Sequence, residues 1–208
     1  VMAMLAYPLS RPNYKYKKIA TFFIFFTMLF SGGLIPTYIW ITRYLHLGDT
    51  IWVYILPCLV NAFHVIVIRS FFQGLPQALM ESAKIDGASE LQTFFKIVMP
   101  LSKPVIATIS LLTLLSRWND WNTALIYIKS SNLYSLQYLL QKILREAEFV
   151  KNMADSSPVA GVDLDLSKLP SVTIRFAMCM VAAGPMLIIF PFFQKYFAKG
   201  LTVGAVKG

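Results

Sequence analysis

Residues 74–104 read GLPQALMESAKIDGASELQTFFKIVMPLSKP, and this stretch decides how the rest of the chain is interpreted. Pro76 suits the first turn of a helix, and Gly87 supplies the left-handed residue that ends a helix at little cost. Ser89, with Gln92 three residues later, forms a capping box that starts a second helix. The pattern therefore predicts two short helices joined by a tight turn.

Both predicted helices carry apolar side chains on one face. In the first helix, 77–86, the apolar stripe is short, whereas the second has the i, i+3, i+4, i+7 spacing of a packed helix face. Pro100 stops the second helix, and Pro104 opens the next segment. The apolar residues are Leu79, Met80 and Ala83 in the first helix and Leu91, Phe94, Phe95 and Val98 in the second. A rigid helix–turn–helix of this kind can transmit a movement of a soluble partner to the segments on either side.

Long apolar stretches flank this loop, and four of them are long enough to cross a membrane. About 20 apolar residues in a helix span the ~30 Å hydrocarbon core of a bilayer. The chain is 57% hydrophobic and only 14% charged, which is unlike a soluble domain. We therefore expect an all-α membrane protein, a polytopic helix bundle. The stretches are 19–42, 51–72, 105–128 and 172–193; residues 1–8 are expected to be the end of a further span, with the N-terminal part of the protein missing.

Glycine and proline residues inside these stretches predict kinks and close contacts between helices. Such residues would damage a soluble helix, but in a membrane bundle the neighbouring helices satisfy the carbonyls that proline frees. The residues are Gly32, Gly33, Pro36, Pro57, Gly184 and Pro185.

The distribution of Lys and Arg predicts which loops face the cytoplasm. The chain has 19 Lys and Arg against 10 Asp and Glu, and the cations concentrate before the first stretch, between the second and third, and after the fourth. By the positive-inside rule these regions, including the loop 74–104 and the C-terminus, are cytoplasmic. The loop 129–171 is then external, and the sequence leaves open whether it is a surface cap or a docking surface for an external partner.

Several other classes of protein are disfavoured. The formal net charge of +9 does not indicate nucleic-acid binding, because the cations lie between long apolar runs and not on one polar face. The sequence contains no GxxxxGK[ST] phosphate loop, so the chain is not expected to be an ATPase. Cys58 and Cys179 lie in apolar runs without metal-ligand spacing, so we expect no metal site. We therefore expect a chain that does no catalysis and binds no cofactor of its own.

Polar side chains within the predicted spans are candidates for a substrate path, because such groups are costly in hydrocarbon. Asn61 and His64 lie three apart on one helix face, where they either line a path or make a contact between helices. His64 has no obvious partner that would make it a catalytic base. Arg117 and Asp120 are also three apart, and we expect them to pair.

The sequence WNDW at 118–121 combines aromatic rings with amide and carboxylate groups. It lies about 20 Å along the span from Pro104, which places it at the external end. Its tryptophans are either interfacial belt residues or surfaces on which a sugar ring stacks. The candidate path residues are therefore Asn61, His64, Trp118, Asn119, Asp120 and Trp121.

The loop 74–104 resembles the EAA motif of ABC importer permeases. That motif reads Glu-Ala-Ala, three residues, Gly, nine residues, Ile, one residue, Leu-Pro. The matching positions are Glu81, Ser82, Ala83, Gly87, Ile97, Met99 and Pro100, with Ser82 and Met99 as mild departures. The fuller form, with Asp86, Ala88 and Phe94, is similar to the maltose-type carbohydrate permeases. The resemblance extends from 7–10 to 204–208, and segments 31–37 and 118–121 point to the branch that imports oligosaccharides with a lipoprotein binding subunit.

The resemblance implies a type I ABC importer transmembrane domain whose first loop helix is the coupling helix, docked in a groove of a cytoplasmic ATPase. Glu81 and Asp86 would make polar contacts to the ATPase, Leu79, Met80 and Ala83 would fill the groove, and Gly87 would set the turn. The residues assigned to coupling are Leu79, Met80, Glu81, Ser82, Ala83, Asp86, Gly87, Ile97 and Pro100.

The resemblance also implies partners and a location. We expect a second homologous permease, two ATPase subunits that bind ATP and Mg, and an external solute-binding lipoprotein, together in the bacterial cytoplasmic membrane with its lipid. A permease of the same fold for amino acids, phosphonates or metals is the first alternative, which the Trp-rich outer segment disfavours. A stand-alone secondary transporter would need two repeated halves with broken helices, which the sequence does not show. The identity of the saccharide, neutral or acidic, is left open.

Overall fold

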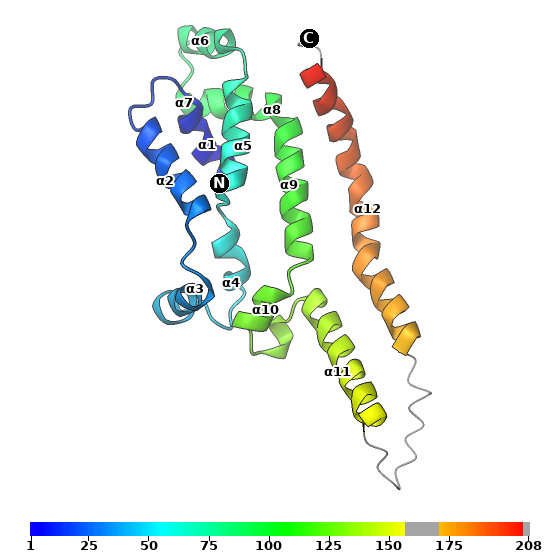
Figure 1. Cartoon of the computed structure of the whole chain (residues 1–208). Coiled ribbons are helices and arrows are strands. Elements are labelled where there is room, and N and C mark those ends of the chain that lie inside the picture. Colours follow the sequence, from blue (N-terminus) through cyan, green and yellow to red (C-terminus); the bar gives the residue numbers. More distant parts are fainter. Residues whose placement is uncertain (157–170, 206–208) are drawn as a thin grey trace.

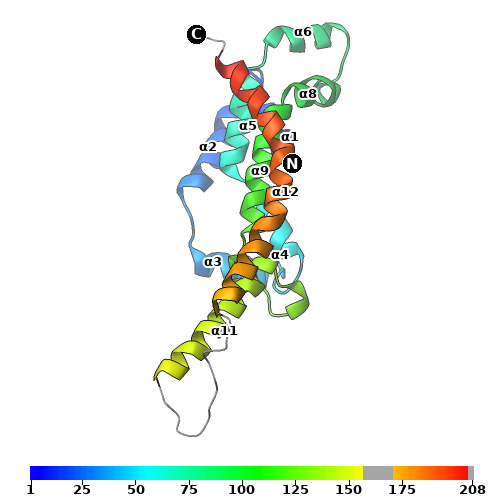
Figure 2. The ribbon, with the colours of Figure 1, turned by 90° about the vertical axis from the view of Figure 1, so that its right-hand side faces the viewer.

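The computed structural model describes residues 1–156 and 171–205, and within these residues it contains helices and no β-strand (Figure 1). Its centre is a set of helices that run side by side in both views (Figures 1 and 2): α1 (Met2–Ser10), α2 (Lys17–Leu29), α5 (Ala62–Gln73), α9 (Lys103–Trp118) and α12 (Ser171–Ala205). The all-α fold predicted from the sequence is confirmed.

The core of this bundle joins α1, α5 and α9 to the helices of the 74–104 loop. Small and β-branched side chains allow α1 and α5 to approach closely, and three residues of the loop, Met80, Phe94 and Val98, complete the cluster. The buried members include Ala6, Leu9, Val65, Ile68, Phe72, Phe94, Val98, Val105 and Ile109. The loop is therefore part of the core and not a passive connection.

One described helix is long and apolar enough to cross a membrane alone, the Phe176–Gln194 part of α12. It continues through Pro185 and Pro191 as a single helix. Three further candidates are pairs of helices bent at a short break, so up to four spans result if each pair counts as one. These candidates overlap the four stretches expected from hydropathy, which remain predicted spans.

The expected span 19–42 is not one helix, and this corrects the sequence-based expectation of a kink. α2 ends at Leu29, Phe30 is extended, and α3 (Leu34–Ile39) with the π-helical η1 (Trp40–Tyr44) leaves at 113° to α2 (Figure 1). Gly33 has φ 87°, which a residue with a side chain rarely adopts. Gly33 is the N-cap of α3, so the chain turns in a short non-helical segment between the two helices instead of bending within one helix.

The second stretch bends less. α4 (Trp52–Ile55) and the 3-10 turn η2 (Leu56–Cys58) meet α5 at 43°, with Pro57 in η2 shortly before the break at 59–61. Proline lacks the N–H that a continuous helix needs there. The kink expected at Pro57 is confirmed.

The third stretch, expected to run from 105 to 128, is also divided. α9 ends at Trp118, and the chain turns into α10 (Asn122–Tyr127), η4 (Ser131–Leu133) and α11 (Leu136–Ser156), which projects from this end of the bundle (Figure 2). A second, smaller core of Ile41, Val53 and Ile128 holds α10 against η1 and α4.

The opposite end of the bundle carries the loop helices (Figure 2): α6 (Gln77–Ile85), α7 (Glu90–Thr93), the π-helical η3 (Phe94–Val98) and α8 (Met99–Leu101). α6 lies at the outer end of the bundle with its Met80 in the core cluster, and α7, η3 and α8 form a bent connection that meets α9 at 78°. We call α6, the turn 86–89, α7, η3 and α8 the loop hairpin.

Candidate functional site

The turn of the loop hairpin is a Schellman motif built around Gly87. Gly87 has φ 75°, its N–H donates to the Lys84 carbonyl at 3.0 Å, and the Ala88 N–H donates to the Ala83 carbonyl at 2.9 Å. These two bonds satisfy carbonyls at the end of α6 that would otherwise lack partners. The left-handed glycine predicted from the sequence is confirmed, and Asp86 is the exposed residue that caps α6.

The second helix begins with the predicted capping box. The Gln92 N–H donates to Ser89 Oγ at 3.2 Å, and the Ser89 N–H donates to Gln92 Oε1 at 2.9 Å. The two residues satisfy each other's backbone donors at the helix start. The turn between the helices therefore has little freedom to change its angle.

The apolar face of α6 packs partly on this chain and partly faces outward. Met80 and Ala83 are buried, and Met80 belongs to the main core cluster, whereas Leu79 is 42% and Ile85 is 86% exposed. The side chains of Glu81 and Ser82 are also exposed. The outward surface of α6 thus combines two large apolar side chains with polar ones.

The second helix departs from its predicted four-residue face. Phe94 and Val98 are buried, but Leu91 is 65% and Phe95 is 55% exposed. Residues 94–98 form a π-helix, whose wider turn changes which side chains share a face. Ile97 is half-buried against the core, and Pro100 is exposed in α8.

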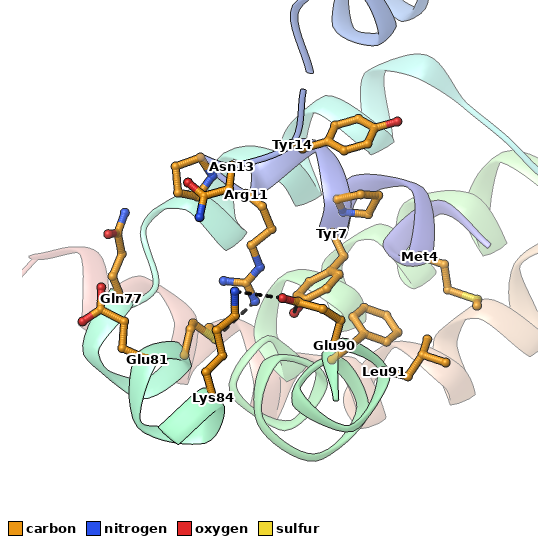
Figure 3. A pocket seen from close by; sticks show the side chains of 14 residues that line it. Met4, Tyr7, Arg11, Asn13, Tyr14, Gln77, Glu81, Lys84, Glu90 and Leu91 are labelled. Atoms are coloured by element: carbon orange, nitrogen blue, oxygen red, sulfur yellow. Dashed lines mark hydrogen bonds and ion pairs between the residues drawn. The ribbon is translucent and has the colours of Figure 1, made fainter. Parts of the chain in front are cut away.

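A polar link ties the loop hairpin to α1 (Figure 3). The Tyr7 hydroxyl donates to Glu90 Oε2 at 2.7 Å, and Lys84 Nζ lies 3.0 Å from Glu90 Oε1. The Tyr7 ring also contacts Phe94, with ring centroids 5.1 Å apart. The hydrogen bond from Tyr7, and then that from Lys84, lowers the pKa of Glu90 below its ordinary value. α6, α7 and α1 are therefore joined through one carboxylate.

Two arginines bind the C-terminal end of α1. The Arg11 guanidinium lies 4.3 Å over the Tyr7 ring and donates to Met80 Sδ at 3.3 Å. Arg69 Nε, on α5, donates to the Leu9 carbonyl at 3.1 Å. Sequence reasoning used both arginines only for orientation, because no local spacing shows which distant group a cation contacts.

Asn61 and His64 lie where α5 begins. Asn61 is the N-cap, and its Oδ1 accepts from the His64 backbone N–H at 3.1 Å. His64 is half-buried, and its Nδ1 has no hydrogen-bond partner among the described residues. The three-residue spacing of Asn61 and His64 is therefore that of a helix N-cap, which lies at the bend of the 51–72 stretch.

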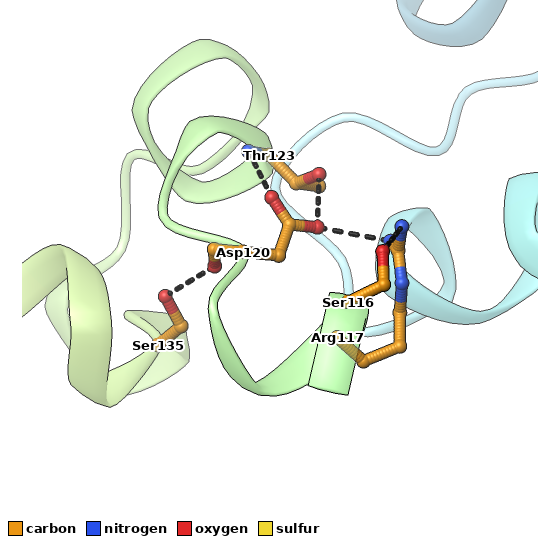
Figure 4. A network of polar contacts seen from close by, with 5 residues as sticks. All are labelled: Ser116, Arg117, Asp120, Thr123 and Ser135. Carbon is orange, nitrogen blue, oxygen red and sulfur yellow. Dashed lines mark hydrogen bonds and ion pairs between the residues drawn. The ribbon is translucent and has the colours of Figure 1, made fainter. Parts of the chain in front are cut away.

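Asp120 organises the turn between α9 and α10 (Figure 4). Its Oδ2 accepts from Arg117 Nη1 at 2.9 Å and from the Thr123 hydroxyl at 2.7 Å, and its Oδ1 accepts from the Thr123 N–H at 3.0 Å. The Ser135 hydroxyl donates to the Asp120 carbonyl at 3.0 Å, which attaches the start of α11. The predicted pairing of Arg117 and Asp120 is confirmed.

The other members of the 118–121 segment have different environments. Trp118 Nε1 donates to the Ala182 carbonyl of α12 at 2.8 Å, so this indole joins two helices. Asn119 is exposed and donates to the Leu115 carbonyl. Trp121 is half-buried and lies 5.5 Å from the Arg145 guanidinium of α11. Asn119 is therefore the exposed member of the segment, and Trp118 is the one whose side chain is bonded to α12.

A clamp at the same end of the molecule was not predicted. Asp49 Oδ1 accepts from the N–H groups of Lys129 and Ser130 at 2.9 and 2.8 Å, and Oδ2 accepts from the Ser130 hydroxyl at 2.6 Å. Asp49 has φ 55°, a conformation that Asp tolerates better than most residues. The hydrogen bonds from Ser130, the hydroxyl first, lower the pKa of Asp49. The only local signal was the Gly-Asp pair at 48–49, which indicates a turn.

Within the described residues, no group of His, Cys, Asp and Glu side chains has the arrangement of a metal site. Two cavities lie at the loop hairpin, one lined by α1, residues 11–14, α6, α7 and η3, the other by α6, the turn 86–88, α7 and η3. The candidate functional regions are thus the loop hairpin with its link to α1, and the polar turn around Asp120.

Comparison with known proteins identifies the family of this chain. A family model described as "Binding-protein-dependent transport system inner membrane component" matches residues 1–203. The chain is 42% identical over 212 residues to the Polygalacturonan/rhamnogalacturonan transport system permease protein YtcP of Bacillus subtilis, covering 99% of this chain and 70% of that protein. It is 34% identical over 208 residues to the Arabinooligosaccharides transport system permease protein AraQ of Bacillus subtilis, covering 99% of this chain and 66% of that one.

A solved structure has the same fold. "Crystal structure of a bacterial ABC transporter involved in the import of the acidic polysaccharide alginate" matches with a TM-score of 0.78 at 31% identity, over 95% of this chain and 67% of that chain. The chain thus spans about two thirds of the length of these relatives. The family that the loop 74–104 was found to resemble is confirmed.

Proposed function

This chain belongs to the family of binding-protein-dependent transport system inner membrane components, and from that premise we propose that it forms part of the path through which an ATP-driven importer moves oligosaccharides. It is a membrane permease component with the type I ABC importer fold. In the proposed importer it has no catalytic role, and separate ATPase subunits bind ATP and Mg. Its C-terminus and loop hairpin face the cytoplasm, as the cation distribution predicts.

The observation that carries the proposal is the loop hairpin. Its turn is fixed by Gly87 and by the Ser89–Gln92 capping box, and Glu90 joins it to α1. A soluble partner that moves α6 therefore moves α1 and the core of the bundle with it. A loop without this function would not need such a rigid construction.

We assign two roles to the coupling residues. The exposed side chains Leu79, Glu81, Ser82 and Asp86 form the surface that contacts the ATPase. Met80, Ala83 and Ile97 instead hold α6 and η3 on this chain, because they are buried or half-buried here. Gly87 sets the turn, and Pro100 lies where the hairpin returns to the bundle.

Partners follow from the same proposal. The importer contains a second homologous permease, two ATPase subunits and an external solute-binding lipoprotein. Large apolar surfaces of α2 and α12 support a lipid or permease contact, since Phe22, Phe23 and Phe192 are each more than 60% exposed in the isolated chain.

The substrate class rests on the relatives and on the turn around Asp120. Permeases named for polygalacturonan and for arabinooligosaccharides, and a transporter described for alginate, are similar to this chain. Trp121 and Asn119 offer a ring face and an amide near the Arg145 guanidinium, which suits a saccharide. The other candidate path residues support the region around Trp121 indirectly. Asn61 caps α5 through the His64 N–H, Trp118 bonds to α12, and Asp120 holds the turn between α9 and α10.

The proposal is tested by uptake into proteoliposomes that contain the assembled transporter, its binding protein and internal ATP. We expect uptake of an oligosaccharide, reduced roughly fivefold by Trp121→Leu and partly restored by Trp121→Phe, since a stacking loss of ~1 kcal/mol has that effect. Trp52→Leu is the matched control, because Trp52 is an exposed tryptophan of α4. Uptake of an amino acid or metal but of no saccharide would overturn the substrate class. Equal uptake by both leucine variants and wild type, with assembly intact, would place the path elsewhere.

A further inference from the structure

A cavity of about 520 Å³ lies between the end of α1, residues 11–14, α6 and the start of α7 (Figure 3). Its two ends differ in polarity. Arg11, Gln77, Glu81 and Lys84 lie at one end, Met4 and Leu91 lie at the other, and the Glu90 carboxylate, paired with Lys84, lies between them. Cavities of this size hold small organic ligands, and this one matches a molecule with a polar head and an apolar tail.

Arg11 has unused hydrogen-bonding capacity at the polar end. A guanidinium carries five N–H donors. One donates to the Met80 thioether, a weak acceptor, and Arg11 Nε is buried without a partner among the described residues. The nearby Glu90 carboxylate is already shared by Tyr7 and Lys84. Arg11 is therefore suited to bind the anionic group of a ligand, with two donors in a fork.

The segment of the chain that carries Arg11 is basic, although the carboxylates of Glu81 and Glu90 also line the cavity. The segment 9–18 contains Arg11, Lys15, Lys17 and Lys18 and no Asp or Glu. It leads directly into α2, whose phenylalanine side chains are exposed along its length. In the proposed orientation, this places the polar end of the cavity at the headgroups of the cytoplasmic leaflet, where anionic lipids gather near basic segments.

The apolar end opens toward exposed apolar surface. Met4, Leu5 and Leu91 are 53%, 41% and 65% exposed, although each is a large apolar side chain. Met4 and Leu5 lie on the part of α1 that runs back toward the middle of the bundle (Figure 1). An acyl chain leaving the cavity here would cover them.

We propose that this cavity binds an anionic phospholipid of the cytoplasmic leaflet, with the phosphate on Arg11 and the start of an acyl chain along Met4 and Leu91. The inference rests on the orientation given in the proposed function. Because α1, α6 and α7 all line the cavity, the bound lipid stabilises the attachment of the loop hairpin to α1.

The test uses the assembled transporter in nanodiscs of phosphatidylcholine, with or without phosphatidylglycerol. Native mass spectrometry after partial delipidation measures retained phosphatidylglycerol. We expect wild type to retain it, and Arg11→Gln to bind it about tenfold more weakly, as the loss of a charge-assisted hydrogen bond predicts. Leu91→Asn should also weaken retention; its side chain is exposed, so this change leaves the fold intact. Lys96→Gln, which removes a cation from the same loop but outside this cavity, should retain the lipid as wild type does.

Two outcomes would overturn the proposal. One is equal retention of phosphatidylglycerol by wild type, Arg11→Gln and Leu91→Asn. The other is a thermal stabilisation in phosphatidylcholine alone by soluble glycerol phosphate that equals the effect of phosphatidylglycerol, because the site would then bind a free anion. Lipid retention is measured without transport, so its failure is distinguishable from failure of saccharide uptake.

Discussion

Gly87 holds the turn between α6 and α7 in a conformation that few residue types adopt. Its φ is 75°, and a Cβ placed on it would meet no heavy atom within 4 Å. A β-branched residue therefore fits in space and is disfavoured by the backbone alone, by about 1–2 kcal/mol. We expect Gly87→Val to lower uptake per ATP hydrolysed, or to release the ATPase, while the permease still inserts. The ratio of uptake to ATP hydrolysis is obtained by measuring both in the same proteoliposomes.

Gly87→Asn is the control for that experiment. Asparagine visits the left-handed region more readily than valine, so it should keep most of the coupling. Normal uptake by Gly87→Val, with the ATPase retained at wild-type level, would mean that the turn is not part of the coupling mechanism.

The carboxylate of Glu90 gives the link between α1 and the loop hairpin a dependence on pH. Its pKa is lower in the folded chain than the ordinary value of 4.5, so its contribution is complete above that value and is lost as pH falls through the folded pKa. Tyr7→Phe removes one hydrogen bond to it and should lower the free energy of unfolding by about 1 kcal/mol near neutral pH, a modest value because Glu90 is exposed.

The difference in thermal midpoint between wild type and Tyr7→Phe should shrink as the pH falls below 4.5, the ordinary pKa of Glu, and through the lower folded pKa of Glu90. Tyr16→Phe, at an exposed tyrosine of the same region, should change the midpoint little at either pH. A difference for Tyr7→Phe that stays constant from neutral to acidic pH would show that packing on Phe94, and not the hydrogen bond, is what Tyr7 contributes.

Sequence motifs predicted the structural role of a residue where its hydrogen-bond partner is near in the sequence, and did not where the partner is distant. Gly87 and the Ser89–Gln92 pair act within a few residues, so spacing was sufficient. Trp118 bonds to a carbonyl 64 residues away, and neither its identity nor its neighbours indicate that contact. A tryptophan at the end of a span has the same sequence pattern whether it faces lipid, sugar or another helix.

At the level of elements, hydropathy located the apolar segments but not their directions. The 19–42 stretch is apolar throughout, yet α2 ends at Leu29 and α3 turns away by 113°. Average hydropathy does not record the two glycines that make this possible. The same holds for α9, which ends at Trp118 because Asp120 and Thr123 start a new helix.

The Asp49 clamp connects two such elements, the loop after η1 and the segment after α10. We expect Asp49→Ala to lower the thermal midpoint of the complex, because the N–H groups of Lys129 and Ser130 lose their acceptor. Asp49→Asn keeps one acceptor oxygen and tolerates φ 55°, so it should lower the midpoint less. Equal midpoints for wild type and Asp49→Ala would show that other contacts hold these segments together.

The folded carboxylate of Asp49 also has a lowered pKa, chiefly through the Ser130 hydroxyl. Its contribution is present above the ordinary pKa of Asp, 3.8, and lost as pH falls through the lower folded value. The gap between wild type and Asp49→Ala should therefore close on strong acidification. Lys129→Gln is the matched control, because the clamp uses the backbone N–H of Lys129 and not its side chain.

At the scale of the whole molecule, two observations were required to propose an orientation. The positive-inside rule assigns the loop hairpin and the C-terminus to one side, and the structure places α6 and the end of α12 at one end of the bundle, with α11 at the other (Figures 1 and 2). The arrangement of helices is thus compatible with the orientation that the cation distribution predicts. A chemical test in intact cells decides between the two orientations.

That test places single cysteines at opposite ends of the molecule. Cys58 and Cys179 are first replaced by alanine, because both are free thiols. In intact cells, a cysteine at Ser131, an exposed position of η4, should react with a membrane-impermeant maleimide, and one at Ser89, exposed in the hairpin turn, should react only after the cells are opened. The two positions are similarly exposed, so the difference reports the side of the membrane and not access within the protein. Labelling of Ser89→Cys in intact cells with protection of Ser131→Cys would reverse the orientation, and the loop hairpin would then be on the wrong side to meet an ATPase.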